Sequence, residues 1–166
     1  MREPVARLIR LLHAGSADET RAIGARLAHA LQVAPDDQAI VITLSGDLGA
    51  GKTTLVAGLL AALGHPGPTR SPTYTLIEPY RLAGRDFYHC DLYRLRHPDE
   101  LDDLGLRDLR VAGSVLVVEW PERAGGRLGE PDLALQLSYE GEGRTIDLEA
   151  SSPAGQALAA QLSGQT

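Results

Sequence analysis

The sequence contains one glycine-rich segment whose residue types and spacing suit the binding of a polyphosphate. Its residues, Gly46-Asp47-Leu48-Gly49-Ala50-Gly51-Lys52-Thr53, fit the pattern G-x-x-x-x-G-K-T. Lys52 is the only lysine in a chain that has fifteen arginines. Its ammonium is a compact charge that fits against the β- and γ-phosphates of a nucleotide, whereas the planar fork of arginine is wider. We therefore predict that Lys52 binds phosphates together with the backbone N–H groups of residues 49–53, and that the Thr53 hydroxyl binds Mg²⁺.

Two acidic residues stand where a phosphate-binding loop needs partners. Such a loop requires a carboxylate at the end of a neighbouring strand, which holds Mg²⁺ opposite the threonine hydroxyl. Glu119 ends the apolar run Val115-Leu116-Val117-Val118, and Asp91 ends the run Phe87-Tyr88-His89-Cys90. We predict that Glu119 is a metal ligand and that Asp91 orients or deprotonates water. For either residue alone, a solvated acid at a strand end is the alternative.

Two further features near these motifs each allow two interpretations. Ser71-Pro72-Thr73-Tyr74-Thr75 carries three hydroxyls and a phenol, a composition suited to ordering around a γ-phosphate and relaxing after hydrolysis. It equally fits a polar turn before an edge strand. Trp120, the only tryptophan, follows Glu119 and fits either the rim of the site or a structural aromatic.

The apolar pattern predicts the strands and helices that would position these residues. The glycine-rich segment lies between a β-branched run at 39–44 and an Ala/Leu-rich helix at 53–63, the order that phosphate binding requires. A capping-box pattern at Ser16 predicts a helix through Leu31. The other expected elements are strands at 5–12, 73–80, 86–93 and 114–120, an antiparallel pair at 133–139 and 145–149, short acidic helices within 98–109, and a closing helix at 154–162.

Length, charge and composition limit the class of protein. A chain of 166 residues is most simply one domain, residues 1–166. The net charge of −6, with ten carboxylates against nine arginines between residues 70 and 127, predicts weak nonspecific attraction to nucleic acid. Cys90 is the single cysteine, so we expect a small buried hydrophobe and no intrachain disulfide. Charged residues interrupt the N-terminal segment and no stretch reaches membrane-spanning length, which predicts a cytoplasmic protein without a membrane partner.

Four motifs, in this order, resemble those of the TsaE family of bacterial ATPases. They are residues 46–54, Ser71-Pro72-Thr73-Tyr74-Thr75, His89-Cys90-Asp91-Leu92-Tyr93-Arg94-Leu95 and Val118-Glu119-Trp120-Pro121. The resemblance covers roughly residues 16–139, including Glu19-Thr20 in the first predicted helix. Cys90 departs from the pattern, because an aromatic residue or a methionine is common at its position.

The resemblance implies a fold and a function. The fold would be α/β and P-loop NTPase-like, with a mixed, largely parallel central sheet flanked by helices and a C-terminal antiparallel strand pair. The protein would bind ATP or ADP with Mg²⁺, hydrolyse ATP weakly, and serve the threonylcarbamoyladenosine modification of tRNA at the adenosine beside the anticodon. It would act in a complex with the TsaB and TsaD proteins, and it would meet tRNA only indirectly through that complex.

The resemblance also implies roles for individual residues. Catalysis would involve Lys52, Asp91 and Thr73, the last within the switch-like segment. Thr53 and Glu119 would hold the metal. Thr20 would lie near the base, and Trp120 would lie close to the nucleotide or to a partner. The remaining nucleotide contacts would come from Asp47, Leu48, Gly49, Ala50, Gly51, Lys52, Thr53 and Thr54.

Hydrolysis by such a site is slow when no cation reaches the transferring phosphoryl group, since a supplied arginine raises the rate by about 10³ to 10⁵. Arg94, near Asp91, is the candidate cation within the chain, and a partner would otherwise complete the site. The main alternative is a small-molecule kinase in which Arg70, Arg81 or Arg85 clamps an acceptor. A nucleotide-gated binding module with incidental hydrolysis is the third interpretation.

Overall fold

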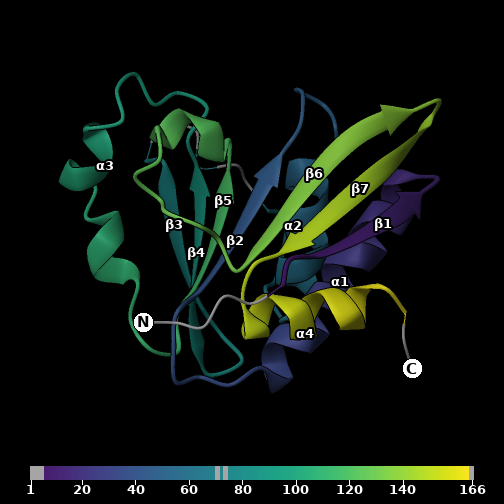
Figure 1. Ribbon diagram of the computed structural model, residues 1–166, viewed down its shortest axis with the longest axis horizontal. Helices are drawn as coiled ribbons and strands as arrows, with labels where there is room; N and C mark the ends of the chain where they lie inside the picture. Colours follow the sequence, from purple (N-terminus) through teal and green to yellow (C-terminus); the bar gives the residue numbers. More distant parts are fainter. Residues whose placement is uncertain (1–5, 70–71, 73–74, 165–166) are drawn as a thin grey trace.

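Seven strands form one mixed sheet in the computed structural model, which describes residues 6–69, 72 and 75–164 (Figure 1). Their order across the sheet is β1-β7-β6-β2-β5-β4-β3. They span Leu8–Ala14 (β1), Ile40–Ser45 (β2), Ile77–Leu82 (β3), Arg85–Asp91 (β4), Val115–Glu119 (β5), Leu133–Glu140 (β6) and Gly143–Ala150 (β7). The central strands β6, β2, β5 and β4 run parallel, whereas β1, β7 and β3 pair antiparallel with their neighbours. The prediction of a mixed sheet with a parallel centre and a C-terminal antiparallel pair is confirmed.

Helices flank this sheet. The longer ones are α1 (Ala17–Val33), α2 (Lys52–Ala62) and α4 (Pro153–Leu162); the short ones are α3 (Glu100–Asp103) and the 3-10 turns η1 (Leu106–Leu109) and η2 (Pro121–Ala124). Figure 1 shows α1, α2 and α4 grouped together, with α3 at the opposite side of the molecule. Within the described ranges, no helix is both long enough and apolar enough to cross a membrane.

Two buried clusters explain why the central strands are continuous apolar runs. Val115 and Val117 of β5 pack in the cluster that includes α1, α2 and α4, whereas Leu116 and Val118 pack in the cluster that includes α3 and η1. Because successive strand residues point to opposite faces, a strand covered on both faces needs apolar residues throughout. Cys90 lies fully buried in the second cluster, and this burial raises the pKa of its thiol to about 12, so the expected buried hydrophobe is confirmed.

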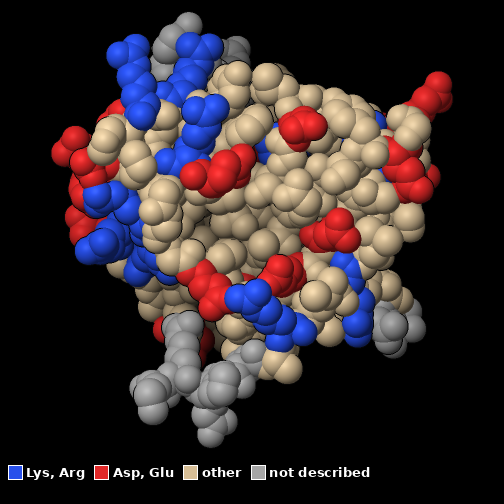
Figure 2. Space-filling model, turned by 45° about the horizontal axis from the view of Figure 1, so that its top comes forward, with Lys and Arg blue, Asp and Glu red and all other residues tan. Residues whose placement is uncertain are grey.

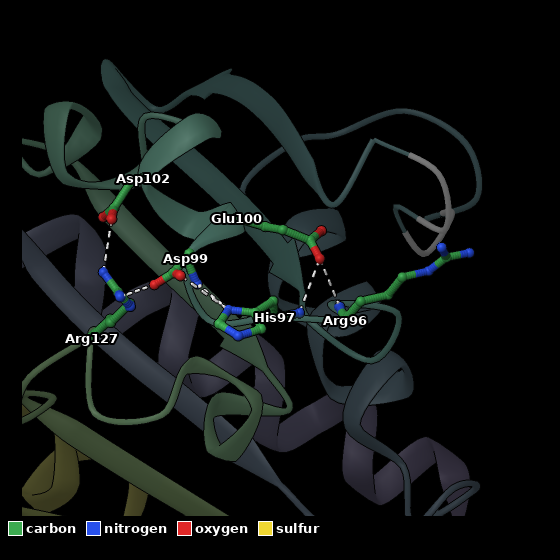
Figure 3. Close-up of polar contacts among 6 residues, drawn as sticks. All are labelled: Arg96, His97, Asp99, Glu100, Asp102 and Arg127. Atoms are coloured by element: carbon green, nitrogen blue, oxygen red, sulfur yellow. Dashed lines mark hydrogen bonds and ion pairs between the residues drawn. The ribbon is translucent and has the colours of Figure 1, made fainter.

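Ion pairs at the surface connect the segment around α3, which covers the cluster containing Leu116 and Val118, to the chain that follows η2 (Figure 3). Arg127, which follows η2, pairs with Asp99 and with Asp102, the latter at 2.7 Å. The carboxylate of Glu100 accepts the backbone N–H groups of residues 96–97 at 3.1 and 3.0 Å. These contacts join the start of α3 to the chain after β5, and so hold two segments that cross the same face of the sheet.

The edge strands differ from the sequence-based prediction. The strand expected at 73–80 begins only at Ile77, because Leu76 has a φ of 62°, which lies in the left-handed region and interrupts an extended chain. The strand expected at 5–12 spans Leu8–Ala14, and its pairing with β7 continues as far as Ala14 opposite Arg144. Trp120, expected as the last residue of a strand, lies outside β5. Val5 of the first expected strand and residues 73–74 of the third fall outside the described ranges.

Glycines allow α1 and α2 to approach closely. A Cβ atom on Gly58 of α2 would lie 2.1 Å from the Arg21 carbonyl oxygen, and one on Gly24 of α1 would lie 2.1 Å from the Leu55 carbonyl oxygen. Both distances are far inside van der Waals contact, and both neighbours are backbone atoms that cannot rotate away. The contact therefore fixes α2, and with it the loop that precedes α2, against α1.

Replacing Gly58 with alanine is expected to lower the free energy of unfolding by about 1 to 3 kcal/mol, the usual cost of overpacking a filled interior. Alanine has the higher helix propensity, by about 1 kcal/mol, so a loss of stability reports the helix contact and not the intrinsic preference. Urea unfolding followed by circular dichroism measures the change. A Gly58→Ala protein as stable as the wild type would show that the helix contact is not tight.

Candidate functional site

The glycine-rich loop (residues 46–51) connects β2 to α2 at the carboxyl edge of the parallel strands. Gly46, Gly49 and Gly51 have φ values of 146°, 81° and 106°, which residues with a side chain rarely adopt. Gly46 also approaches β6, since a Cβ atom there would lie 2.5 Å from the Leu137 carbonyl oxygen. The three glycines are therefore required by the course of the loop.

The first turn of α2 differs from the first turns of the other long helices. Ser16 caps α1 by accepting the Glu19 N–H, and Ser152 caps α4 by accepting the Gly155 N–H. The corresponding residue of α2 is Gly51, which has no side chain to do this. The N–H groups at the start of α2, at the positive end of the helix, therefore remain suited to an anion.

Lys52 lies buried at this helix start, with 4% of its surface exposed. Its Nζ donates to the carbonyl oxygens of Gly46 at 2.5 Å and Asp47 at 3.0 Å. The same Nζ lies 4.4 Å from the ring centroid of Trp120, within the range of a cation–π contact. The ammonium is thus directed back over the glycine-rich loop and held between the loop and the residue after β5.

Carboxylates surround this ammonium. Burial lowers the pKa of Lys52, and the charges of Glu119, Glu122, Asp91 and Asp47 act in the opposite direction. One cation among four carboxylates is a poor site for a polyphosphate by itself, because the acids repel the phosphates. A divalent cation would reverse that repulsion, so the composition of the site suits a phosphate and a metal ion together.

Glu119 and Thr53 lie in contact, as a shared metal site requires. Thr53 Oγ1 lies 3.2 Å from Glu119 Oε1, although the two residues are 66 positions apart in the sequence. The other carboxylate oxygen of Glu119 lies 2.5 Å from Nε2 of His89, and both side chains are almost fully buried. Because a carboxylate only accepts, the imidazole donates this hydrogen bond. His89 therefore orients Glu119 so that its Oε1 faces Thr53.

Asp91 ends β4 directly beside Glu119, its register partner on the parallel strand β5. The backbone N–H of Tyr93 donates to Asp91 Oδ1 at 3.0 Å, which fixes the carboxylate at the strand end. Asp91 is only partly buried, whereas Glu119 is 2% exposed. The two predicted acids thus occupy adjacent positions, with the more exposed one placed to meet water.

Trp120 forms the side of the site nearest β5. Its φ of 57° and ψ of 51° are left-handed, a conformation that is strained for a bulky residue. Its ring packs against that of Tyr93 with centroids 5.0 Å apart, and the Arg123 guanidinium lies 5.5 Å from Tyr93 and 6.0 Å from Trp120. Trp120 therefore connects Lys52 to an aromatic and cationic group on the surface.

A small cavity of about 80 Å³ is lined by residues of the loop, the starts of α1 and α2, and the β6–β7 hairpin. Four residues predicted to contact the nucleotide line it: Thr20 from α1, Gly49 and Gly51 from the loop, and Thr54 from α2. The cavity is lined by Ser16, Ala17, Thr20, Gly49, Gly51, Thr54, Glu142, Gly143 and Arg144. The β6–β7 hairpin, to which the sequence assigned no role, therefore forms part of its wall.

Of the remaining candidates, two fall outside the described ranges, and the described ones include two arginines, Arg94 and Arg85. Thr73 belongs to the part of the chain that is not described, as does Arg70. Arg94 is exposed. Arg85 begins β4, at the end opposite Asp91, where its guanidinium donates to the carbonyls of Leu31 at 2.9 Å and Gly113 at 3.1 Å. Arg85 therefore stabilises the end of α1 and does not reach the loop.

Among the described residues, His89, Tyr139 and Arg144 bond to site residues through their side chains, and the sequence assigned none of them a role. The motif containing His89 was recognised, but nothing in it indicated a contact with Glu119. Tyr139 and Arg144 are register partners in the predicted antiparallel pair, so the hairpin alone would have placed them together. Nothing in the sequence connects that hairpin to the glycine-rich loop.

Comparison with known proteins identifies the family. A model of the family described as "Threonylcarbamoyl adenosine biosynthesis protein TsaE" matches residues 14–146. The chain belongs to the TsaE family. The match extends beyond both ends of the segment that carried the resemblance in the sequence, and it includes β6 and the first residues of β7, which line the cavity.

Curated TsaE relatives span most of the chain. The tRNA threonylcarbamoyladenosine biosynthesis protein TsaE of Haemophilus influenzae is 42% identical over 140 residues, which cover 84% of this chain and 89% of the relative. The Bacillus subtilis protein of the same name is 38% identical over 125 residues, 75% of each chain. The crystal structure of Bacillus subtilis YdiB superposes with a TM-score of 0.66 at 30% identity, over 96% of this chain and 97% of that one.

Proposed function

We propose that this TsaE chain is a Mg²⁺-dependent ATPase with a P-loop NTPase-like fold that serves threonylcarbamoyladenosine biosynthesis on tRNA in the cytoplasm. The single observation that carries the proposal is the convergence of Lys52, Thr53 and Glu119 at the start of α2. The names of the Haemophilus and Bacillus relatives support the tRNA pathway. Membership of the TsaE family supports the role in threonylcarbamoyladenosine biosynthesis, and the geometry of the loop supports the ATPase activity.

The polyphosphate of ATP or ADP would bind to two kinds of donor. The first is the Lys52 ammonium, which already lies over the loop at 2.5 Å from the Gly46 carbonyl oxygen. The second is the set of backbone N–H groups at the start of α2, aided by the helix dipole. The nucleoside would lie toward the cavity that Thr20 and Thr54 line.

The metal site would be formed by Thr53 and Glu119, whose oxygens lie 3.2 Å apart. Oxygen donors of this type are those that Mg²⁺ prefers. No group of three or more His, Cys, Asp or Glu side chains suited to a metal occurs among the described residues, so phosphate and water would supply the other ligands. When bound there, Mg²⁺ neutralises charge on the phosphates. His89 keeps Glu119 correctly oriented for this role.

Asp91 would orient the attacking water and accept its proton, because it is the accessible carboxylate next to Glu119. In this proposal a partner supplies the stabilising cation, so hydrolysis by the isolated chain would be weak. TsaB and TsaD would complete the site and raise the rate of hydrolysis, and the chain would meet tRNA only through that complex. Thr73 would contribute through the switch-like segment, as the family resemblance implies.

The proposal also accounts for the charge distribution. Figure 2 shows basic side chains gathered toward the α3 side of the face that includes the sheet's carboxyl edge, with acidic side chains among them and across the centre. The chain carries a net charge of −6. A mixed surface of this kind favours protein partners over direct binding to tRNA phosphates.

The small-molecule kinase has little support among the described residues. Of the three arginines that would clamp an acceptor, Arg85 is bonded to carbonyls at the far end of β4, and Arg81 pairs with Asp86 at 3.0 Å. Labelled ATP distinguishes the two activities. The ATPase should release labelled free phosphate in a cell extract, whereas transfer of the label to a small molecule would support the kinase.

Reconstitution of tRNA modification tests the proposed function. TsaB and TsaD, tRNA, ATP, Mg²⁺ and the remaining precursors of the modification are combined with wild-type chain, with Lys52→Ala chain, or with neither. We expect modified adenosine only with the wild type. Equal yields in all three reactions would overturn the proposal.

Trp120 fluorescence is expected to respond to nucleotide. The chain has one tryptophan, and its ring lies 4.4 Å from Lys52 Nζ, so binding of phosphates to that ammonium changes the charge beside the indole. We expect a saturable change in emission on titration with ATP and Mg²⁺. Lys52→Ala protein is the control and should give no such change, and a silent wild-type titration at saturating nucleotide would contradict the placement of Trp120.

A further inference from the structure

Two side chains of the β6–β7 hairpin donate to three consecutive carbonyls of the glycine-rich loop. The Tyr139 hydroxyl donates to the Leu48 carbonyl at 2.9 Å. Arg144 Nη2 donates to the Gly49 carbonyl at 3.2 Å, and its Nε donates to the Ala50 carbonyl at 3.0 Å. These bonds connect residues 91 to 95 positions apart, so they are tertiary contacts and not part of a local turn.

The two donors also support each other. Tyr139 and Arg144 are directly paired across β6 and β7, and the Arg144 guanidinium lies 4.2 Å from the centroid of the Tyr139 ring. Arg144 Nη1 donates further to the carbonyls of Glu142 at 3.2 Å and Gly143 at 2.8 Å. The guanidinium is therefore held on both sides, by its own hairpin and by the loop.

The fit between the hairpin and the loop is tight. A Cβ atom on Gly49 would lie 2.6 Å from the Tyr139 hydroxyl oxygen. On the far side, a Cβ atom on Gly143 would lie 2.7 Å from the Ala14 carbonyl oxygen, so the hairpin rests against the end of β1. The hairpin that contacts the loop is therefore itself held in place by β1.

Fixing a carbonyl also fixes the N–H of the next residue. A trans peptide is planar, and its C=O and N–H point in opposite directions. Bonds that hold the carbonyls of Leu48 and Ala50 toward the hairpin therefore direct the N–H groups of Gly49 and Gly51 away from it. N–H groups directed in this way are what an anion needs in the concave side of such a loop.

We propose that Tyr139 and Arg144 are positioning residues that hold the glycine-rich loop in its phosphate-binding shape before nucleotide arrives. The inference rests on the proposed function, because it concerns the same phosphate site. Its effect is pre-organisation: a loop that is already ordered loses little conformational freedom when the ligand binds. Both residues act through the loop backbone, and neither is required to contact the nucleotide.

This role differs from that of a nucleoside contact, which Arg144 could otherwise make because it lines the cavity. Inorganic tripolyphosphate separates the two roles, since it has no base or ribose. We call the bonds of Tyr139 and Arg144 to the loop the clamp. Loss of the clamp should weaken the binding of tripolyphosphate and the binding of ATP by the same factor. Loss of a nucleoside contact should weaken the binding of ATP and leave the binding of tripolyphosphate unchanged.

The experiment is calorimetric titration of the full chain with Mg²⁺ and either ATP or tripolyphosphate. Tyr139→Phe removes one hydroxyl and keeps the ring, and Arg144→Lys keeps the charge but cannot span two carbonyls. Tyr80→Phe and Arg81→Lys are the matched controls, because they lie on β3, at the edge of the sheet away from β6 and β7. Thermal unfolding without ligand is recorded for each variant.

We expect Tyr139→Phe to raise the dissociation constants of both ligands by about two- to tenfold, the usual effect of one hydrogen bond, with unchanged affinity in the controls. Arg144→Lys should raise both constants by about tenfold or more, because two bonds are lost. If Arg144→Lys protein bound both ligands with wild-type affinity, the charge alone would matter, and the proposal of a clamp would be overturned. So would a loss confined to ATP, or lower thermal stability with unchanged affinity. Wild-type protein that binds neither ligand would instead refute the proposed function, and the clamp with it.

Discussion

Replacing Lys52 with alanine is expected to weaken ATP binding by about 1.5 to 3 kcal/mol, or roughly 10- to 150-fold in the dissociation constant. The ammonium is buried at the start of α2 and held over the loop by the Gly46 and Asp47 carbonyls, so it meets the phosphates without being moved far. Nearby carboxylates make the loss larger, since the phosphates would then face Glu119 and Asp91 without this positive charge. Calorimetry with ATP and Mg²⁺ measures the effect.

Arg10→Ala is the matched control for Lys52→Ala. Arg10 lies on the exposed edge strand β1, and the described contact of its guanidinium is with the Ile9 carbonyl. Removing it takes away one positive charge from the same protein without touching the loop. Equal ATP affinity in the wild type and in Lys52→Ala would refute the role of Lys52. Equal losses of ATP affinity in Lys52→Ala and Arg10→Ala would show only a general effect of net charge.

Replacing Asp91 with asparagine is expected to leave ATP binding nearly intact and to lower turnover by about 10² to 10⁴, the range for removal of a general base. The amide keeps the size of the side chain and can still accept the Tyr93 N–H, but it cannot take a proton from water. Phosphate release in the presence of TsaB and TsaD, under single-turnover conditions, measures the chemical step. Binding is followed separately by calorimetry.

Asp86→Asn, on the same strand, is the control for the general effect of losing a carboxylate from β4. A parallel loss of binding and turnover in Asp91→Asn would mean that Asp91 is a metal ligand and that its role has been exchanged with that of Glu119. Unchanged turnover would remove Asp91 from the chemistry. If Asp91→Asn bound ATP, failed to hydrolyse it and still supported repeated tRNA modification, the nucleotide-gated binding module would be the better description.

The central strands and the loop could be predicted because their signals are local. β2 and β5 are covered on both faces, so their apolar runs are unbroken, and the loop pattern defines its own strand and helix. Glu119 and Asp91 were each predicted at the end of a strand, and the pairing of β4 with β5 in the structure places them side by side. The edge strand β3 was harder to place, because Leu76 adopts a left-handed conformation that no local pattern requires.

The residues that support the site could not be predicted, because their contacts join distant parts of the chain. Arg144 meets the loop across 94 residues, and His89 meets Glu119 across 30. An arginine at a hairpin turn is ordinarily a solvated surface residue, and a histidine inside a strand is ordinarily a core residue. Only the order of strands in the sheet, with β6 beside β2 and β4 beside β5, brings them to the site.

The most direct test of the account is where ATP binds on the chain. Backbone amide signals of the isotope-labelled protein can be followed by NMR while ATP and Mg²⁺ are added. We expect the largest shifts at Gly49, Gly51, Lys52 and Thr53, and we expect them to saturate together with the change in Trp120 fluorescence. Shifts concentrated on any other surface, or a loop whose signals stay in place at saturating ATP, would contradict it.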